Sequence, residues 1–142
     1  MDTPQELKAR ALRYLVRREH SRDELSRKLA PHAESAEILE GTLNWLESTN
    51  KLSNQRFAEV RSHQLARKYG AARIRQDLKA KGIEDYPVSA AGELERARAI
   101  LARKYREPAT SREEHARRAR FLQSRGFSYD TIRSALSNEL EK

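Results

Sequence analysis

The chain has 142 residues, the length of one ordinary domain or of several small modules in a row. Its 29 Lys and Arg against 21 Asp and Glu give a net charge of +8 at pH 7, which favours partners with negative surfaces. The absence of cysteine excludes disulfides and thiol chemistry, and no apolar run reaches the roughly 20 residues that span a bilayer. The polar amino terminus lacks the apolar stretch of a secretory signal, so we expect a cytoplasmic protein.

Helical spacing of apolar residues and capping signals predict about nine helices and no strand. The clearest helix starts are three capping boxes, each with Ser or Thr three residues before Glu: Thr3 with Glu6, Ser21 with Glu24, and Ser111 with Glu114. Gly70, Gly82 and Gly126 stand where a helix end favours a left-handed residue. In chain order, the predicted helices cover residues 4–16, 22–30, 35–48, 54–69, 71–81, 86–92, 93–105, 112–124 and 128–140.

A five-residue motif is repeated along the chain. Residues 65–69 and 101–105 both read Leu-Ala-Arg-Lys-Tyr, and residues 15–19 form a looser copy, Leu-Val-Arg-Arg-Glu. Downstream of the two identical copies, Leu78 with Gly82-Ile83 matches Leu122 with Gly126-Phe127 at the same spacing. The repetition predicts an all-α fold of three tandem three-helix units in an elongated, curved arrangement with a long surface. The units cover residues 1–52, 53–92 and 93–142.

The residue types that mark catalytic, metal and nucleotide sites form no recognisable pattern. The four histidines are dispersed without metal-ligand spacing, and the five glycines form no phosphate-binding loop. Acidic pairs such as Glu113-Glu114, and Glu93 with Glu95, lie in charged helical contexts that are typical of solvated faces or ion pairs. We therefore predict a protein that is not an enzyme, with no catalytic residue, no metal site, no cofactor and no small-molecule substrate.

Basic side chains are the candidate binding residues. Arg grips phosphates or carboxylates through a planar fork, so a basic surface suits DNA or an acidic protein, and the sequence does not separate the two. For any one of these residues a solvated helix face is the alternative, and the aromatic residues Tyr69, Tyr105 and Phe121 are predicted to pack in the core. The candidates are Arg67, Lys68, Arg73, Arg75, Lys79, Lys81, Arg103, Lys104, Arg117, Arg118, Arg120 and Arg125.

Three segments in order resemble the RecX family. They are residues 11–29, with Tyr-Leu, Ser-x-x-Glu-Leu and Lys-Leu; the central stretch from Leu52 to Ile83; and a looser carboxy-terminal segment around Arg125-Gly126-Phe127. One departure concerns the residues before Arg-Phe-Ala, where the family commonly has Asp and Glu. Here they are Asn54 and Gln55, which puts in doubt any role of an acidic residue there.

The resemblance implies a regulator of the RecA recombinase that lies in the helical groove of the RecA filament on DNA. It also implies modulation, mostly inhibition, of RecA's ATP hydrolysis, strand exchange and co-protease activity in DNA repair, homologous recombination and the SOS response. We expect weak binding to single- and double-stranded DNA, no membrane partner, and a monomer. The alternative is an independent helix-turn-helix DNA-binding protein with residues 71–81 as recognition helix, for which duplex binding would be tight and sequence-dependent.

Overall fold

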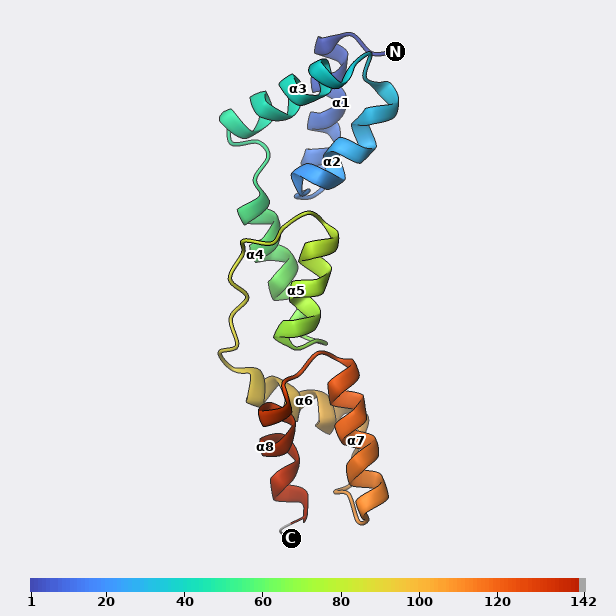
Figure 1. The fold of residues 1–142 in the computed structure, drawn as a ribbon, viewed down its shortest axis with the longest axis vertical. Coiled ribbons are helices and arrows are strands. Elements are labelled where there is room, and N and C mark those ends of the chain that lie inside the picture. The colour runs from blue at the N-terminus through green and yellow to red at the C-terminus, as the bar shows by residue number, and fades with distance from the viewer. Residues whose placement is uncertain (141–142) are drawn as a thin grey trace. The chain divides into compact units, whose positions relative to one another are not determined.

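The computed structural model describes residues 1–140, with side chains as far as Ser137, and these residues form helices and connections without a strand (Figure 1). The last two residues of the predicted third unit lie outside this range. The helices are α1 (Pro4–Arg17), α2 (Arg22–Leu29), the short 3-10 helix η1 (Ala30–His32), α3 (Ala36–Ser48), α4 (Asn54–Leu65), α5 (Ala71–Ala80), α6 (Glu93–Lys104), α7 (Arg112–Ser124) and α8 (Tyr129–Leu140). The predicted all-α fold is confirmed.

The predicted helix over residues 86–92 is wrong, because residues 83–90 form an irregular connection. Pro87 disfavours the helical conformation at Tyr86, and Val88 and Ser89 are weak helix formers. Gly92 then takes a left-handed conformation (φ 74°) directly before α6. The segment therefore lacks a run of residues long enough to hold a helix.

The two identical pentapeptides end their helices with the same hydrogen bond. The amide of Tyr69 donates to the carbonyl oxygen of Leu65 at 2.9 Å, and the amide of Tyr105 donates to that of Leu101 at 2.7 Å. In the earlier copy the amide of Lys68 also donates to Leu65, at 3.0 Å, so α4 closes in a tight turn and stops at Leu65 rather than at residue 69. The sequence repeat is thus a repeat of helix ends.

The capping predictions hold with one difference. Thr3 with Glu6, and Ser21 with Glu24, form the full reciprocal pattern. The hydroxyl of Ser111 accepts from the Glu114 amide at 3.1 Å, but the Glu114 carboxylate accepts instead from the amide of Thr110 at 2.9 Å. Only half of the third box therefore forms.

The second repeated feature, a helix end followed by an apolar residue, is confirmed. Gly82 and Gly126 are left-handed, with φ of 82° and 90°. In each case the amide after the glycine donates to a carbonyl oxygen in the last turns of the helix. The amide of Ile83 donates to Leu78 at 2.9 Å, and the amide of Phe127 donates to Leu122 at 3.2 Å. These bonds satisfy helix carbonyl groups that would otherwise lack a partner, and they turn Ile83 and Phe127 into the interior.

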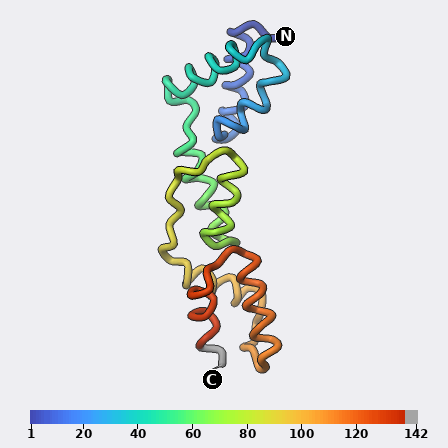
Figure 2. Tube along the Cα trace, viewed as in Figure 1, coloured from blue at the N-terminus to red at the C-terminus, as the bar shows by residue number. Residues whose placement is uncertain are grey.

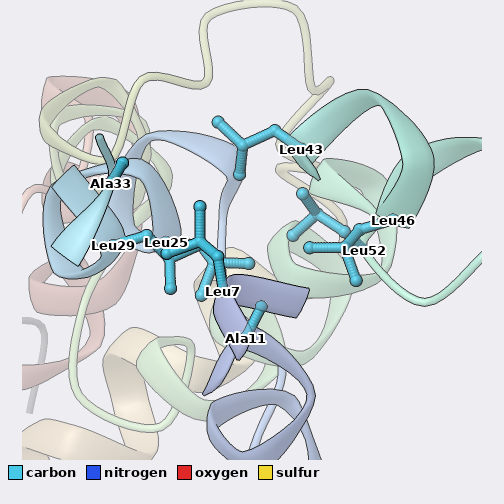
Figure 3. Packing of buried hydrophobic residues seen from close by; sticks show 8 residues of the cluster. All are labelled: Leu7, Ala11, Leu25, Leu29, Ala33, Leu43, Leu46 and Leu52. Atoms are coloured by element: carbon cyan, nitrogen blue, oxygen red, sulfur yellow. The ribbon is translucent and has the colours of Figure 1, made fainter. Parts of the chain in front are cut away.

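The chain divides into two compact units: residues 1–61 with 78–86 form the first, and residues 62–77 with 87–142 form the second. In the first unit, α1, α2 and α3 contact one another around a core of leucines (Figure 3). Leu7, Leu25, Leu29 and Leu46 are fully buried, and Ala11, equally buried, is small enough for the helices to approach closely. Ala33, Leu43 and Leu52 complete the cluster drawn in Figure 3.

The second unit has its own core on α6, α7 and α8. Figure 2 follows the trace from α6 through α7 into α8, drawn in tan to red, and both α6 and α7 contact α8. The core includes Ala97, Leu101, Leu122, Phe127 and Leu136. It fixes the end of α6, where the third pentapeptide copy lies.

Candidate functional site

The positive charge of the protein is concentrated in the second unit. The first unit has 13 Lys and Arg against 12 Asp and Glu, whereas the second has 16 against 9. In the first unit, ion pairs such as Arg10 with Asp2, at 2.7 Å, neutralise part of the surface. The net charge that suggested an anionic partner therefore belongs almost entirely to one half of the molecule.

A groove of about 640 Å³ in the second unit collects five of the predicted binding residues; we call it the basic groove. Both identical pentapeptides contribute their Arg-Lys pair to it, and none of the acidic residues whose side chains the structure describes lines it. Among the side chains that the structure describes, none of its five cations forms an ion pair. The lining residues are Arg67, Lys68, Tyr69, Ile100, Arg103, Lys104, Phe121 and Arg125.

Two hydrogen bonds to main-chain carbonyl oxygens hold the walls of the basic groove together. The guanidinium of Arg103, near the end of α6, donates to the carbonyl oxygen of Arg67, just after α4, at 2.8 Å. The amide of Gly70 donates to the carbonyl oxygen of Arg125, after α7, at 2.8 Å. Three helix ends that are distant in sequence are thereby placed next to one another.

Gly70 is not left-handed, so that prediction is wrong. A different constraint explains why this position holds a glycine. A Cβ at this position would lie 2.5 Å from the carbonyl oxygen of Gly126, closer than real atoms come. The carbonyl of Gly70 accepts the first helical hydrogen bond of α5, from Ile74 at 3.2 Å, so Gly70 occupies the N-cap position. Close backbone packing thus leaves α5 without a side-chain cap of its own.

Glu93 supplies the missing cap. Its Oε1 accepts from the amide of Ala71, the first residue of α5, at 2.6 Å, and its Oε2 accepts from the hydroxyl of Thr131 at 3.4 Å. The side chain is buried, so the expectation of a solvated or ion-paired Glu93 is wrong. A carboxylate at a helix N-terminus is also favoured by the helix dipole.

In the first unit, Asn54 caps a helix other than its own in the same way. Like Glu93, it is the first residue of its helix, and its Oδ1 accepts from the amide of Arg22, the first residue of α2, at 2.8 Å. This contact needs an oxygen acceptor and not a negative charge. An amide in place of the family's acidic residue is therefore compatible with this structural role.

Two aromatic rings support the cations of the basic groove. The guanidinium of Arg125 lies 5.3 Å from the centre of the Tyr69 ring and 5.1 Å from that of Phe121. The ammonium of Lys104 lies 4.3 Å from the Phe121 ring, and the guanidinium of Arg73 lies 4.7 Å from the Tyr69 ring. Tyr69 and Phe121 are half-buried and line the groove, so they are only partly the core residues that the sequence suggested.

The other candidate cations are not brought together at the basic groove. Arg118 is buried, lies over the Tyr105 ring at 4.3 Å, and donates to the carbonyl oxygen of Glu107 at 2.8 Å. With Arg117 it lines a second cavity of about 320 Å³. Arg73 is exposed and donates to the carbonyl oxygen of Ser124 at 3.0 Å, while the rest lie on helix surfaces or just beyond: Arg75, Lys79, Arg120 and the half-buried Lys81.

The first copy of the pentapeptide differs from the other two because two of its side chains form ion pairs. Its Arg18, at the position of Lys68 and Lys104, pairs with Glu24 at 3.0 Å. Glu19 stands at the tyrosine position and pairs with Arg56 at 2.9 Å. In this copy, ion pairs therefore occupy the lysine and tyrosine positions of the motif.

The part of the chain that the structure describes lacks two other kinds of feature, a metal site and a membrane span. Its His, Asp and Glu side chains include no group that could hold a metal ion. Over the same residues, the helices are too short or too polar to cross a bilayer.

Comparisons with known proteins agree with the helical repeat. Family models match residues 8–46, 53–91 and 91–136, as the first, second and third three-helix domains of RecX. The regulatory protein RecX of Herbaspirillum seropedicae is 48% identical over 138 residues, which cover 93% of this chain and 90% of that protein. The regulatory protein RecX of Ralstonia nicotianae is 49% identical over 131 residues, covering 88% and 82%.

A solved structure shows the same fold. The crystal structure of RecX from Lactobacillus salivarius matches with a TM-score of 0.82 over 98% of this chain and 97% of that one, at 21% identity. Tandem three-helix domains along the chain, with close relatives over nearly its whole length, place this protein in the RecX family of regulatory proteins.

Proposed function

We propose that this protein regulates the RecA recombinase by binding the RecA–DNA filament in its helical groove. The basic groove is the observation that carries the proposal. It offers five cations that form no ion pair with the described side chains, on one surface of a protein whose family is regulatory. Binding there would modulate, and mostly inhibit, RecA's ATP hydrolysis, strand exchange and co-protease activity. The chain would act as a monomer, with three-helix units at residues 1–52, 53–92 and 93–142.

The proposed mechanism is occupation of a surface rather than chemistry. The cations of the basic groove are arranged to attract and orient an anion, and they are not paired with a nucleophile or a proton acceptor in the described part of the chain. A regulator of this kind shifts RecA between filament states only by its difference in affinity for them. Its effect should therefore follow the fraction of filament that it occupies.

The direct test adds the purified protein in increasing amounts to RecA, single-stranded DNA and ATP, and follows ATP hydrolysis. We expect hydrolysis to fall at substoichiometric ratios, and to fall less with the double variant Arg67→Ala, Lys68→Ala. A matched control is Arg13→Ala with Arg17→Ala, which removes two exposed cations from α1. Unchanged hydrolysis at every ratio of the wild-type protein would rule the proposal out.

The alternative of an independent helix-turn-helix protein finds less support in the structure. A recognition helix reads bases with residues near its N-terminus. The N-terminus of α5 is instead packed against Gly126 and capped by the buried Glu93. The exposed cations of α5 are Arg73, Arg75 and Lys79, and the one nearest its N-terminus, Arg73, already donates to the carbonyl oxygen of Ser124 at 3.0 Å.

A further inference from the structure

The basic groove gathers more positive charge than a monovalent anion can neutralise. Its five cations come from the Arg-Lys pairs of both identical pentapeptides and from Arg125, and none of the described acidic side chains lines it. Cations that are held close together repel one another, and an anion with several charges relieves that repulsion when it binds among them. The groove is therefore suited to a compact, multivalent anion.

Two aromatic rings bring cations from different helices together. The ammonium of Lys104, at the end of α6, lies 4.3 Å from the centre of the Phe121 ring, and the guanidinium of Arg125, after α7, lies 5.1 Å from the same centre. Arg73 and Arg125 share the Tyr69 ring in the same way, at 4.7 and 5.3 Å. A cation that is already held over a ring loses less side-chain freedom when an anion binds, so the rings prepare the site for its ligand.

The size of the groove determines how closely the charges of its ligand must be spaced. Its volume of about 640 Å³ is that of a site for a small molecule. In a nucleic-acid strand a sugar separates each phosphate from the next, so few of its charges fit in such a volume together. In a polyphosphate a single oxygen atom bridges neighbouring phosphates. Linked phosphates therefore match five cations in one small groove better than a nucleic acid does.

The groove can hold such a ligand with side chains instead of a glycine-rich loop. Arg67, Arg103 and Arg125 each carry a planar guanidinium that can donate to two oxygens of a phosphate, and Lys68 and Lys104 add compact charges. The bond from Arg103 to the Arg67 carbonyl oxygen, at 2.8 Å, uses one of five N–H groups, so donors remain for a ligand. The described lining includes no carboxylate or histidine that could activate water, so a bound phosphate chain is not hydrolysed there.

We propose that the basic groove is a binding site for a chain of three or more linked phosphates, as found in a nucleoside triphosphate or in inorganic polyphosphate. Tyr69 and Phe121 are positioning residues for its cations. The site goes beyond the proposed function, because its ligand is a small soluble anion and not the filament. Where both hold, ligand and filament compete for the same cations, and the ligand releases the protein from RecA.

Isothermal titration calorimetry with sodium tripolyphosphate tests the site on the purified protein, without RecA, nucleic acid or magnesium. We expect one ligand per protein and an affinity at least about tenfold higher than that of AMP, whose single phosphate reaches fewer cations. The matched comparison is a trithymidylate with a 5′-phosphate, which also carries three phosphates but has sugars between them. It should bind more weakly, and equal or tighter binding of this trinucleotide would overturn the proposal.

Paired variants separate the groove from net charge. Arg67→Ala with Lys68→Ala should weaken tripolyphosphate binding by about tenfold, because it removes two of the five cations. Arg13→Ala with Arg17→Ala lowers the net charge equally on exposed positions of α1 and should stay within about twofold of wild type. Equal losses in the two double variants would contradict a specific site.

Substitution of Tyr69 tests the role of the rings. Tyr69→Leu should weaken tripolyphosphate binding by about threefold, because Arg125 and Arg73 lose the ring that holds them. Tyr69→Phe keeps the ring and should restore the affinity. Circular dichroism should be that of wild type in both variants, since Tyr69 is only half-buried. If Tyr69→Leu bound like wild type, the rings would have no positioning role.

The choice of anion identifies the source of the linked phosphates. Tighter binding of ATP than of tripolyphosphate would support a nucleoside triphosphate, with its base against apolar lining such as Ile100. Tighter binding of tripolyphosphate would support inorganic polyphosphate. Citrate offers three carboxylates of similar size, and an affinity equal to that of tripolyphosphate would overturn the proposal, because the groove would then bind any multivalent anion.

Sedimentation with preassembled RecA filaments on single-stranded DNA separates this site from the proposed function. Tripolyphosphate should move the protein from the pellet to the supernatant, while filaments without the protein should still sediment. Retention in the pellet despite tight tripolyphosphate binding would contradict the use of the groove for the filament and leave the phosphate site standing. Failure to bind tripolyphosphate, with RecA inhibition intact, would sink only the phosphate site.

Discussion

The guanidinium of Arg103 donates a hydrogen bond to the main-chain carbonyl oxygen of Arg67, at 2.8 Å. The two residues occupy the same position in the two identical pentapeptides, so the repeat makes contact with itself. Because this bond joins the ends of two helices, the Arg-Lys pairs at these two ends are held on one groove. Through this contact, the sequence repeat forms one basic groove.

Arg103→Ala should weaken binding to the RecA–DNA filament without unfolding the protein. Both partners of its hydrogen bond are exposed, so water replaces the lost donor, and we expect the free energy of unfolding to change by less than about 1 kcal/mol. Arg118→Ala is the comparison, since this buried side chain satisfies the Glu107 carbonyl and should cost about 2 kcal/mol. Thermal unfolding by circular dichroism measures both, and similar losses would contradict the distinction.

Gly70→Ala should destabilise the second unit. The added Cβ would lie 2.5 Å from the Gly126 carbonyl oxygen, and backbone must move to admit it, at an expected cost of about 2 to 3 kcal/mol. Gly41→Ala is a matched control in the middle of α3, where a Cβ meets nothing within 4 Å. That change should stabilise the protein by about 0.5 to 1 kcal/mol, because alanine favours helix. Urea unfolding followed by circular dichroism checks the opposite signs.

Replacing Glu93 tests whether its cap needs charge or only an oxygen. Glu93→Ala leaves the Ala71 amide without its partner and should cost about 1 to 3 kcal/mol. Glu93→Gln keeps an oxygen acceptor, as Asn54 does at the start of α4, and should retain most of the stability. If the Gln variant were as unstable as the Ala variant, the carboxylate charge at the helix N-terminus would be the essential feature. Urea unfolding of both variants measures the difference between their free energies of unfolding.

His20 should make the first unit sensitive to mild acid. It is buried, with Nδ1 3.1 Å from the Arg18 carbonyl oxygen and Nε2 2.8 Å from the ammonium of Lys28. The carbonyl requires Nδ1–H and the ammonium requires a bare Nε2, so the ring is neutral. Burial, with the charges of Arg18 and Lys28, lowers the pKa of His20 below its ordinary value of 6.5. The hydrogen bond to the Arg18 carbonyl and the carboxylate of Glu24 oppose this shift. The unfolded chain therefore binds the proton more readily, and stability falls as pH drops below 6.5.

Urea unfolding followed by Trp45 fluorescence between about pH 7.5 and 5 measures this loss. Trp45 is the only tryptophan and packs against the core of the first unit. The carboxyl groups of Asp2 and Glu6 have lowered pKa values because of hydrogen bonds from Arg10 and Thr3, so they destabilise the fold only at lower pH. His20→Leu should flatten the pH dependence, and an unchanged slope in that variant would assign it to other groups.

Local sequence signals predict most of the helices and the repeat. Capping residues such as Thr3 and Ser21 act on amides within their own turn, and Gly82 and Gly126 end helices through their own backbone angles. These effects depend on neighbours in the chain, so they can be predicted without a structure. The predicted helix over residues 86–92 is wrong because Pro87 restricts the backbone of Tyr86 to non-helical conformations.

Contacts between residues distant in the sequence depend on the tertiary structure, so local sequence signals do not predict them. Arg118 and Arg103 are both arginines in basic helices, yet packing buries one and leaves the other on the basic groove. Glu93 and Gly70 are similar cases, because their roles depend on Ala71 and on the Gly126 backbone, which folding brings to them. Composition, residue spacing and repetition are enough to show that the protein is helical, repeated and basic. The fold decided which cations meet, since a side chain's environment is set by whatever packs against it in three dimensions.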